Sequence, residues 1–131
     1  MSQLIPFVAS SIVLFGLDTL WLLSYMGNQY ATMIPRIQQR PMSVNIAFAC
    51  FAYVLMILGL YVFIIPSLHS KSTWKDCLYY GGLFGLVMYG VYDCTAGAVL
   101  TEWDTSVAIV DIMWGMIVYT LAAKTYVWWL Q

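Results

Sequence analysis

Three aspartates, Asp18, Asp93 and Asp111, each lie within a run of apolar residues that is long enough to cross a lipid bilayer. A charged side chain near the bilayer centre costs at least ~2.5–3.5 kcal/mol, so acidic residues in membrane spans are rare and usually face a partner or a cavity. Carboxyl groups in such positions can relay protons, bind a cation or act as an acid or base. These three residues therefore mark the place where a functional site would lie.

Hydrogen-bond donors lie about one helical turn away from each aspartate. Trp21 follows Asp18 by three residues, and the same Asp-x-x-Trp spacing recurs in the last apolar run, while Tyr89 precedes Asp93 by four residues. Residues three or four apart share one face of a helix, and indole N–H and phenol O–H groups are the donors that a buried carboxyl needs. The sequence thus predicts a buried polar site formed by six side chains: Asp18, Asp93, Asp111, Trp21, Trp114 and Tyr89.

The composition is typical of a membrane protein. Of the 131 residues, 63% are hydrophobic and only 8% are charged, whereas soluble domains carry roughly 25% charged residues. The net charge is −1 and the chain has no basic tract, which argues against nucleic-acid binding. The lipid bilayer is therefore the first expected partner.

Four apolar stretches are long enough to cross the hydrocarbon core of a bilayer, which takes about 20 residues of helix. They cover residues 4–26, 44–65, 77–99 and 106–128. Because backbone amides in lipid need internal partners, each stretch is expected to be helical. The sequence therefore predicts an all-α membrane fold, a four-transmembrane-helix bundle that forms a single domain over residues 1–131, with both termini on the same side.

The connecting segments set the expected orientation. Residues 27–43 are expected to form a loop on the membrane surface, because Pro35 and Pro41 would interrupt a helix. The side of the termini carries three lysines, and the other side carries Arg36 and Arg40. The positive-inside rule then favours termini on the cytoplasmic or equivalent side.

The three aspartates are expected at a similar depth in the bundle. At the helical rise, Asp18 lies roughly 12 Å, Asp93 roughly 9 Å and Asp111 roughly 8 Å below the surface that holds the first loop. Carboxyls at one level repel each other when ionised, so at least one is expected to stay protonated unless a cation is present. Arg36 and Arg40 in the first loop are the possible counter-ions, and a bound divalent metal ion is the alternative.

A purely structural role for these residues is also open. Polar side chains within membranes often join helices through hydrogen bonds of ~0.6–2 kcal/mol. Asp111, which lies close to a helix start, could simply stabilise the helix dipole. Gly81 and Gly85 form a GxxxG pair, with Gly82 and Gly90 nearby, and small residues at that spacing favour close packing of helices.

Other familiar chemistries lack their residues in this chain. The cysteines Cys50, Cys77 and Cys94 form no CxxC pair, so we interpret them as packing residues. His69 is the only histidine, which leaves a zinc site or a Ser–His nucleophile without its partners. The sequence therefore predicts no cofactor and no metal site, and it favours a role other than catalysis.

The second half of the chain carries a series of motifs with defined spacing. Tyr-Gly-Val-Tyr-Asp-Cys-Thr at residues 89–95 is followed by Trp103 and by Asp-Ile-Met-Trp-Gly at residues 111–115, and the first span contains Asp-Thr-Leu-Trp-Leu at residues 18–22. This pattern resembles the DUF2177 family of small predicted membrane proteins, in which an asparagine stands where this chain has Ala96. The resemblance covers nearly the whole chain and implies four membrane spans, without implying a chemistry. It supports four positions as recurrent polar residues: Asp18, Asp93, Trp21 and Asp111.

Three functions remain open at this point. The small size and short loops favour an accessory or assembly subunit of a larger membrane complex, or a homo-oligomer. Proton- or cation-coupled transport of a small solute through a dimer is the first alternative, because acidic residues at one depth can relay protons or bind a cation. A lipid-modifying membrane enzyme that uses an aspartate as acid or base is the second. Besides lipid, the expected partners are other membrane subunits or a second copy of the chain.

Overall fold

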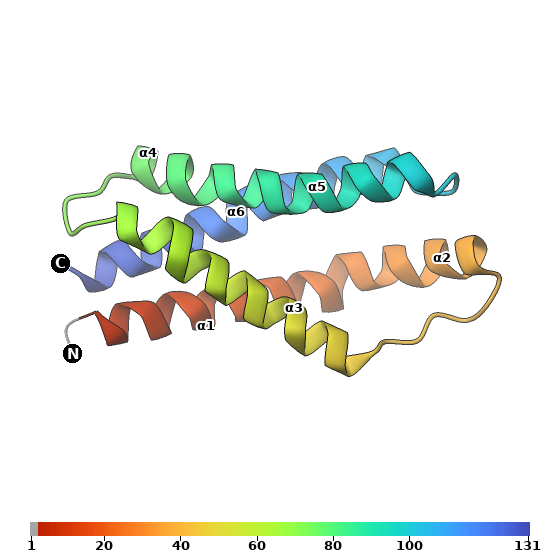
Figure 1. Cartoon of the computed structure of the whole chain (residues 1–131), viewed down its shortest axis with the longest axis horizontal. Helices are drawn as coiled ribbons and strands as arrows, with labels where there is room; N and C mark the ends of the chain where they lie inside the picture. The colour runs from red at the N-terminus through yellow and green to blue at the C-terminus, as the bar shows by residue number, and fades with distance from the viewer. Residues whose placement is uncertain (1–2) are drawn as a thin grey trace.

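The computed structural model describes residues 3–131, which form helices joined by short loops (Figure 1). Within these residues, four continuous helical rods are long and apolar enough to cross a membrane. This confirms the prediction of an all-α, four-helix membrane protein. In chain order the elements are α1 (Leu4–Trp21), a π-helical segment (Leu22–Met26), α2 (Gly27–Gln38), α3 (Ile46–Gly59), a π-helical segment (Leu60–Ile64), a 3₁₀ turn (Ile65–Ser67), α4 (Trp74–Cys77), a π-helical segment (Leu78–Gly82), α5 (Leu83–Val99) and α6 (Thr105–Trp129).

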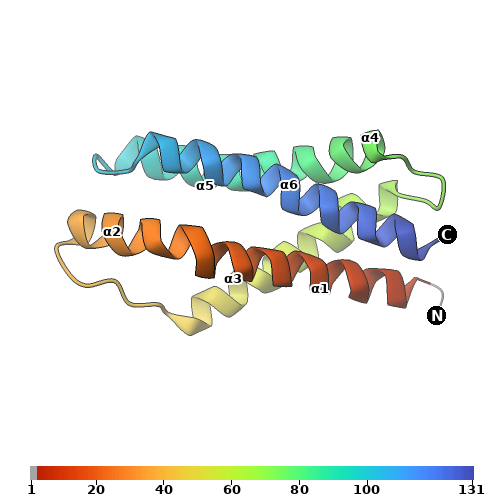
Figure 2. The same ribbon diagram turned by 180° about the vertical axis from the view of Figure 1, so that it is seen from behind.

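The first rod is longer than the sequence suggested. α1, the π-helical segment and α2 form one continuous helix from Leu4 to Gln38 (Figure 2). The expectation that Pro35 would interrupt this helix is wrong, because the proline lies in its last turn. There the lost backbone hydrogen bond affects only the helix end, and apolar residues such as Met33 hold the turn against the α5–α6 connection. The helix ends at Gln39, which adopts a left-handed conformation with φ 55°.

Side-chain caps fix where three of the other helices begin. Asn45 accepts hydrogen bonds from two backbone amides at the start of α3, and Asp104 does the same at the start of α6. Thr73 and Asp76 form a reciprocal capping box at the start of α4. Each cap satisfies amides that have no partner within the helix, and such a cap contributes about 1 kcal/mol.

The helices pack in two layers. α3 and α5 lie in front of α1–α2 and α6 in the view of Figure 1, and α3 crosses the first rod obliquely. α1 begins and α6 ends at the same end of the bundle. The half of the bundle near the termini holds the main apolar core, which includes Leu14, Leu60, Ile64 and Tyr119.

α5 and α6 approach each other most closely. A Cβ atom on Gly85 would lie 2.0 Å from the carbonyl oxygen of Gly115, and one on Gly81 would lie 2.5 Å from that of Tyr119. Only glycine permits such contact between backbones. The predicted packing role of this GxxxG pair is therefore confirmed, whereas Gly90 has no neighbour within 4 Å and belongs to another face.

Candidate functional site

The structure brings the three aspartates together from three helices. Asp18 lies on α1, Asp93 on α5 and Asp111 on α6. Their side chains are 5%, 1% and 4% exposed, so all three carboxyl groups are removed from the surface of the bundle. Asp18 bonds to side chains of α5 and α6, and Asp93 neighbours Asp111, so the three carboxyls share one region of the bundle.

The indole of each Asp-x-x-Trp motif donates a hydrogen bond to the aspartate of the other motif, on the other helix. Trp21 Nε1 donates to Asp111 Oδ1 at 2.9 Å, and Trp114 Nε1 donates to Asp18 Oδ1 at 3.3 Å. The two indole rings stack, with centroids 4.8 Å apart and planes at 10°. The motifs therefore form a reciprocal contact between α1 and α6, in which each tryptophan crosses the helix interface.

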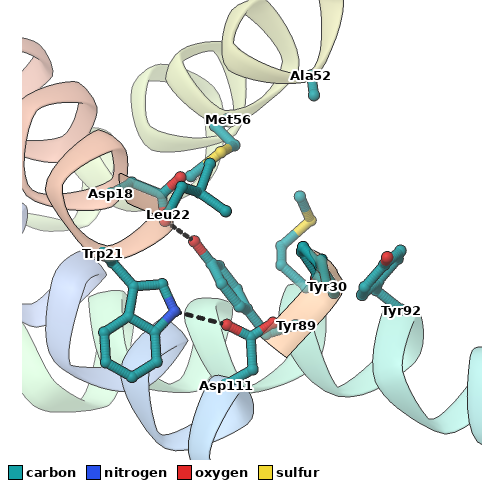
Figure 3. A pocket seen from close by; sticks show the side chains of 10 residues that line it. Asp18, Trp21, Leu22, Tyr30, Ala52, Met56, Tyr89, Tyr92 and Asp111 are labelled. Atoms are coloured by element: carbon teal, nitrogen blue, oxygen red, sulfur yellow. Dashed lines mark hydrogen bonds between the residues drawn. The ribbon is translucent and has the colours of Figure 1, made fainter. Parts of the chain in front are cut away.

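Tyr89 also bonds to a different aspartate from Asp93, the one that its sequence spacing suggested. Its hydroxyl donates to Asp18 Oδ1 (Figure 3), although Tyr89 shares α5 with Asp93. The reason lies in the packing of α5 on α6, because the Tyr89 ring rests on Gly115, where a Cβ atom would come within 2.5 Å of it. That contact directs the tyrosine toward α1.

Asp93 is the least satisfied group of the site. Among the residues described, both of its carboxyl oxygens are buried without a hydrogen-bond donor, and the buried indole N–H of Trp103 has no acceptor. Its polar neighbours are the carboxyl group of Asp111 and the Trp103 indole. Leaving a buried polar group unpaired costs roughly 1–3 kcal/mol, and more for a charged group. Uncompensated polar burial of this kind is typical of functional positions.

A cavity of about 240 Å³ lies beside the aspartates. Its walls combine two carboxyl groups with aromatic rings and apolar side chains (Figure 3). It reaches the surface of the bundle between α3 and α5, where Tyr92 is 52% and Met88 is 37% exposed. The lining residues are Asp18, Trp21, Leu22, Tyr30, Ala52, Met56, Met88, Tyr89, Tyr92 and Asp111.

The π-helical segment Leu22–Met26 explains how Tyr30 reaches this cavity. On an uninterrupted α-helix Tyr30 would lie about 120° around the axis from Asp18. The backbone N–H of Gly27 instead bonds to the carbonyl of Leu22, five residues earlier, and the extra residue in that turn takes up about 100°. The tyrosine therefore faces the same cavity as the aspartate. Sequence reasoning missed Tyr30 because a π-helical turn leaves no clear mark in the apolar pattern.

Apolar clusters lie on both sides of the site along the bundle. The main core fills the half near the termini. At the other end Met33, Trp103 and Ala108 form a second buried cluster, with Tyr30 and Ile37 packed against it. The continuation of the first helix into α2 supplies much of this cluster. The acidic groups are thus held in a low-dielectric layer, in which electrostatic interactions are strong.

The predicted counter-ions do not reach the aspartates. Arg36 and Arg40 are exposed, and Arg36 follows Asp18 by 18 residues on the same rod, roughly 27 Å along the axis. This placement corrects the expectation that they would dip into the site, which assumed a flexible loop where a rigid helix stands. Lys124 lies near α4 at the opposite end, with its Nζ 5.5 Å from the Trp74 ring. Among residues 3–131, no group of three metal-ligating side chains is close enough to hold a metal ion.

The fold and the site together define a small integral membrane protein with four spanning helices and a buried acidic cluster beside a cavity. The chain belongs to the DUF2177 family of predicted membrane proteins, whose family model matches residues 3–128. No curated protein and no solved structure matches the chain.

Proposed function

We propose that this protein is a membrane carrier, in which a small solute occupies the cavity beside the aspartates and exchanges with protons or a cation. The observation that carries the proposal is the cavity itself, which two buried carboxyl groups line within the membrane-spanning part of the bundle. Ionisable residues inside membrane proteins commonly mark substrate or ion pathways. If the carboxyl groups served only to join helices by hydrogen bonds, no cavity would be needed beside them.

Two neighbouring carboxyl groups of the cluster would carry the exchanged proton. The carboxyls of Asp93 and Asp111 lie next to each other, so both being ionised would be costly and a proton between them is favoured. Arrival of a positive charge would favour release of that proton. The tyrosines around the cluster, which offer hydroxyl donors, include Tyr30, Tyr53, Tyr89, Tyr92 and Tyr119.

We further propose that two copies act together. The cavity reaches the surface of one bundle between α3 and α5, and many transporters join two repeats around a central site. The first half of α3 is available for such contact, because Phe48, Phe51 and Val54 are all at least 59% exposed. A second bundle placed there would enclose the open side of the cavity.

Proteoliposomes that contain a pH-sensitive dye test the proposal even though the solute is unidentified. A panel of small cationic, neutral and anionic solutes is added outside, and solute-dependent proton movement is recorded. We expect at least one solute to move protons through the wild type but not through the double variant Asp18→Asn/Asp93→Asn, which keeps the side-chain shapes. Glu102→Gln, at an exposed acidic position, is the matched control. Equal proton movement in the wild type and the double variant with every solute would refute the proposal.

An accessory or assembly subunit, or a homo-oligomer without transport, is the second candidate. The apolar exposure along the second rod, Ile46–Ser67, favours it, since Phe48 on α3 is 76% exposed and Phe63 in the following π-helical segment is 65% exposed. Cross-linking in native membranes followed by mass measurement tests it. A ladder containing other membrane proteins supports a subunit role, and a stable lone monomer in mild detergent contradicts both this candidate and the proposed dimer.

A further inference from the structure

We propose that the solute taken by the cavity is an organic ammonium ion, an inference that rests on the proposed function and assigns its substrate class. The geometry points to this class through three independent features: uncompensated acidic groups, aromatic walls and a small volume. All three are properties of the residues that line the cavity or lie next to them.

The first feature is the missing positive charge. Three carboxyl groups meet in one layer of the bundle, yet the basic side chains lie elsewhere. Arg36 lies at the far end of the first rod and Arg40 in the loop just beyond it. Lys71 lies in the loop before α4, Lys75 on α4, and Lys124 on the part of α6 near α4. A cation from outside the chain, or protons, must therefore balance the carboxylates.

Asp93 provides an independent sign that a partner is missing. It is only 1% exposed, and neither of its oxygens receives a hydrogen bond among the residues described. Its neighbour Asp111 lines the cavity and accepts only the Trp21 indole at Oδ1 among the hydrogen bonds of the structure. A cation beside Asp111 would thus act on both carboxyls. One proton leaves the pair as one ammonium enters, so that charge is conserved.

The second feature is the aromatic wall. Rings of Trp21, Tyr30, Tyr89 and Tyr92, contributed by the first rod and α5, border the cavity (Figure 3). Aromatic faces attract organic cations, and cages of such rings bind quaternary ammonium groups. The three tyrosines supply such rings, whereas the Trp21 ring already packs against Trp114 and Tyr25. A hard metal ion instead needs about six to eight oxygen ligands, and the described residues offer no such group. The aromatic wall therefore favours a cation that carries alkyl groups over a bare metal ion.

The third feature is size and apolar character. The volume of about 240 Å³ is below the ~300–1,000 Å³ of pockets that hold drug-sized ligands. A compact ammonium head fits, whereas a whole lipid does not. Met56 and Met88, which are flexible and polarizable, would contact its alkyl groups.

Binding of benzyltrimethylammonium and of its uncharged carbon isostere, neopentylbenzene, separates charge recognition from hydrophobic partitioning. Binding to the full chain in lipid nanodiscs is followed by tryptophan fluorescence and calorimetry. We expect the cation to bind at least about tenfold more tightly than the isostere, because a desolvated cation–π contact is worth roughly 2 kcal/mol. Equal affinities for the two probes would overturn the inference.

Paired variants keep the test independent of folding defects. Asp111→Asn should weaken cation binding by at least about tenfold, and the exposed Glu102→Gln should leave it unchanged. Tyr92→Leu, at a half-exposed position, should weaken binding several-fold, whereas Tyr92→Phe keeps the ring and should retain it. Unchanged affinity in both Asp111→Asn and Tyr92→Leu would overturn the inference.

The outcome also separates this inference from the proposed carrier function. Ammonium binding that shows the expected variant pattern, without solute-driven proton movement in proteoliposomes, supports the ligand class and overturns the carrier. Proton-coupled movement of a neutral or anionic solute, with no ammonium binding, supports the carrier and overturns the ligand class.

Discussion

Replacing Gly85 by alanine tests the close packing of α5 on α6 that positions the acidic site. The added Cβ atom would lie 2.0 Å from the carbonyl oxygen of Gly115 and 2.5 Å from its carbonyl carbon. Both are backbone atoms, so neither can move away without shifting the whole helix. Gly90, on the same helix, has no neighbour within 4 Å and gives a matched control.

The expected magnitude follows from comparing the two alanine variants. Each gains roughly 0.5–1 kcal/mol from replacing glycine within a helix, so this contribution cancels in the difference. Overpacking costs typically ~1–3 kcal/mol. Gly85→Ala should therefore be less stable than Gly90→Ala by roughly 1–3 kcal/mol, or roughly 5- to 150-fold in the unfolding equilibrium constant.

Reversible unfolding in mixed micelles, followed by circular dichroism, measures this difference. Because Tyr89 lies one turn beyond Gly85 and donates to Asp18, the variant should also perturb the fluorescence of the stacked tryptophans near that carboxyl. Equal stability of the two alanine variants would show that the backbones of α5 and α6 do not approach each other in this way.

Three further predictions concern the polar contacts. A double-mutant cycle of Tyr89→Phe and Asp18→Ala, which removes the acceptor, should give a coupling free energy of ~0.6–1.7 kcal/mol, and strictly additive effects would contradict the hydrogen bond. Asp93→Asn should raise the stability by about 1 kcal/mol, since it replaces one unpaired acceptor oxygen by an amide N–H that can donate to the neighbouring Asp111 carboxyl; a lower melting temperature than the wild type would contradict this interpretation. Trp21→Phe should cost ~0.5–1.5 kcal/mol through the lost indole donor, whereas Trp128→Phe, at a 65% exposed position, should cost almost nothing in the same unfolding assay.

The sequence was sufficient for the spans and for the depth of the aspartates. Hydropathy over about 20 residues reports directly on the need to fill a bilayer, and the helical rise converts residue counts into depth. Asp18, Asp93 and Asp111 could therefore be placed at one level from residue counts alone. Their role as a functional site remains a prediction.

The pairing of donors with acceptors could not be predicted in the same way. Spacing within one helix suggested that each aspartate bonds to the aromatic residue beside it, but Trp21 and Trp114 each cross to the other helix. Which side chains meet across an interface depends on the rotation of each helix about its axis. A single π-helical turn, such as Leu22–Met26, changes that rotation and brings Tyr30 into the site.

The first loop shows a second limit of local patterns. Pro35 and the polar residues around it suggested a surface loop, but tertiary packing of Met33 on Trp103 holds this segment as a helix. The same rigid helix keeps Arg36 away from the aspartates, and Arg40 lies beyond its end. The acidic groups therefore lack a positive partner because of a contact between segments that are distant in the sequence. The hydrophobic periodicity within one segment cannot predict such a contact.

Solid-state NMR of the protein in lipid bilayers, with carbon-13 at the aspartate carboxyl position, tests the convergence of the acidic groups most directly. The chain has only six acidic residues, and Asp-to-Asn variants assign each signal. We expect a carboxyl–carboxyl cross peak between Asp93 and Asp111 that disappears in Asp93→Asn, with both signals shielded from water. Isolated carboxyl signals in contact with bulk water would contradict the shared acidic layer.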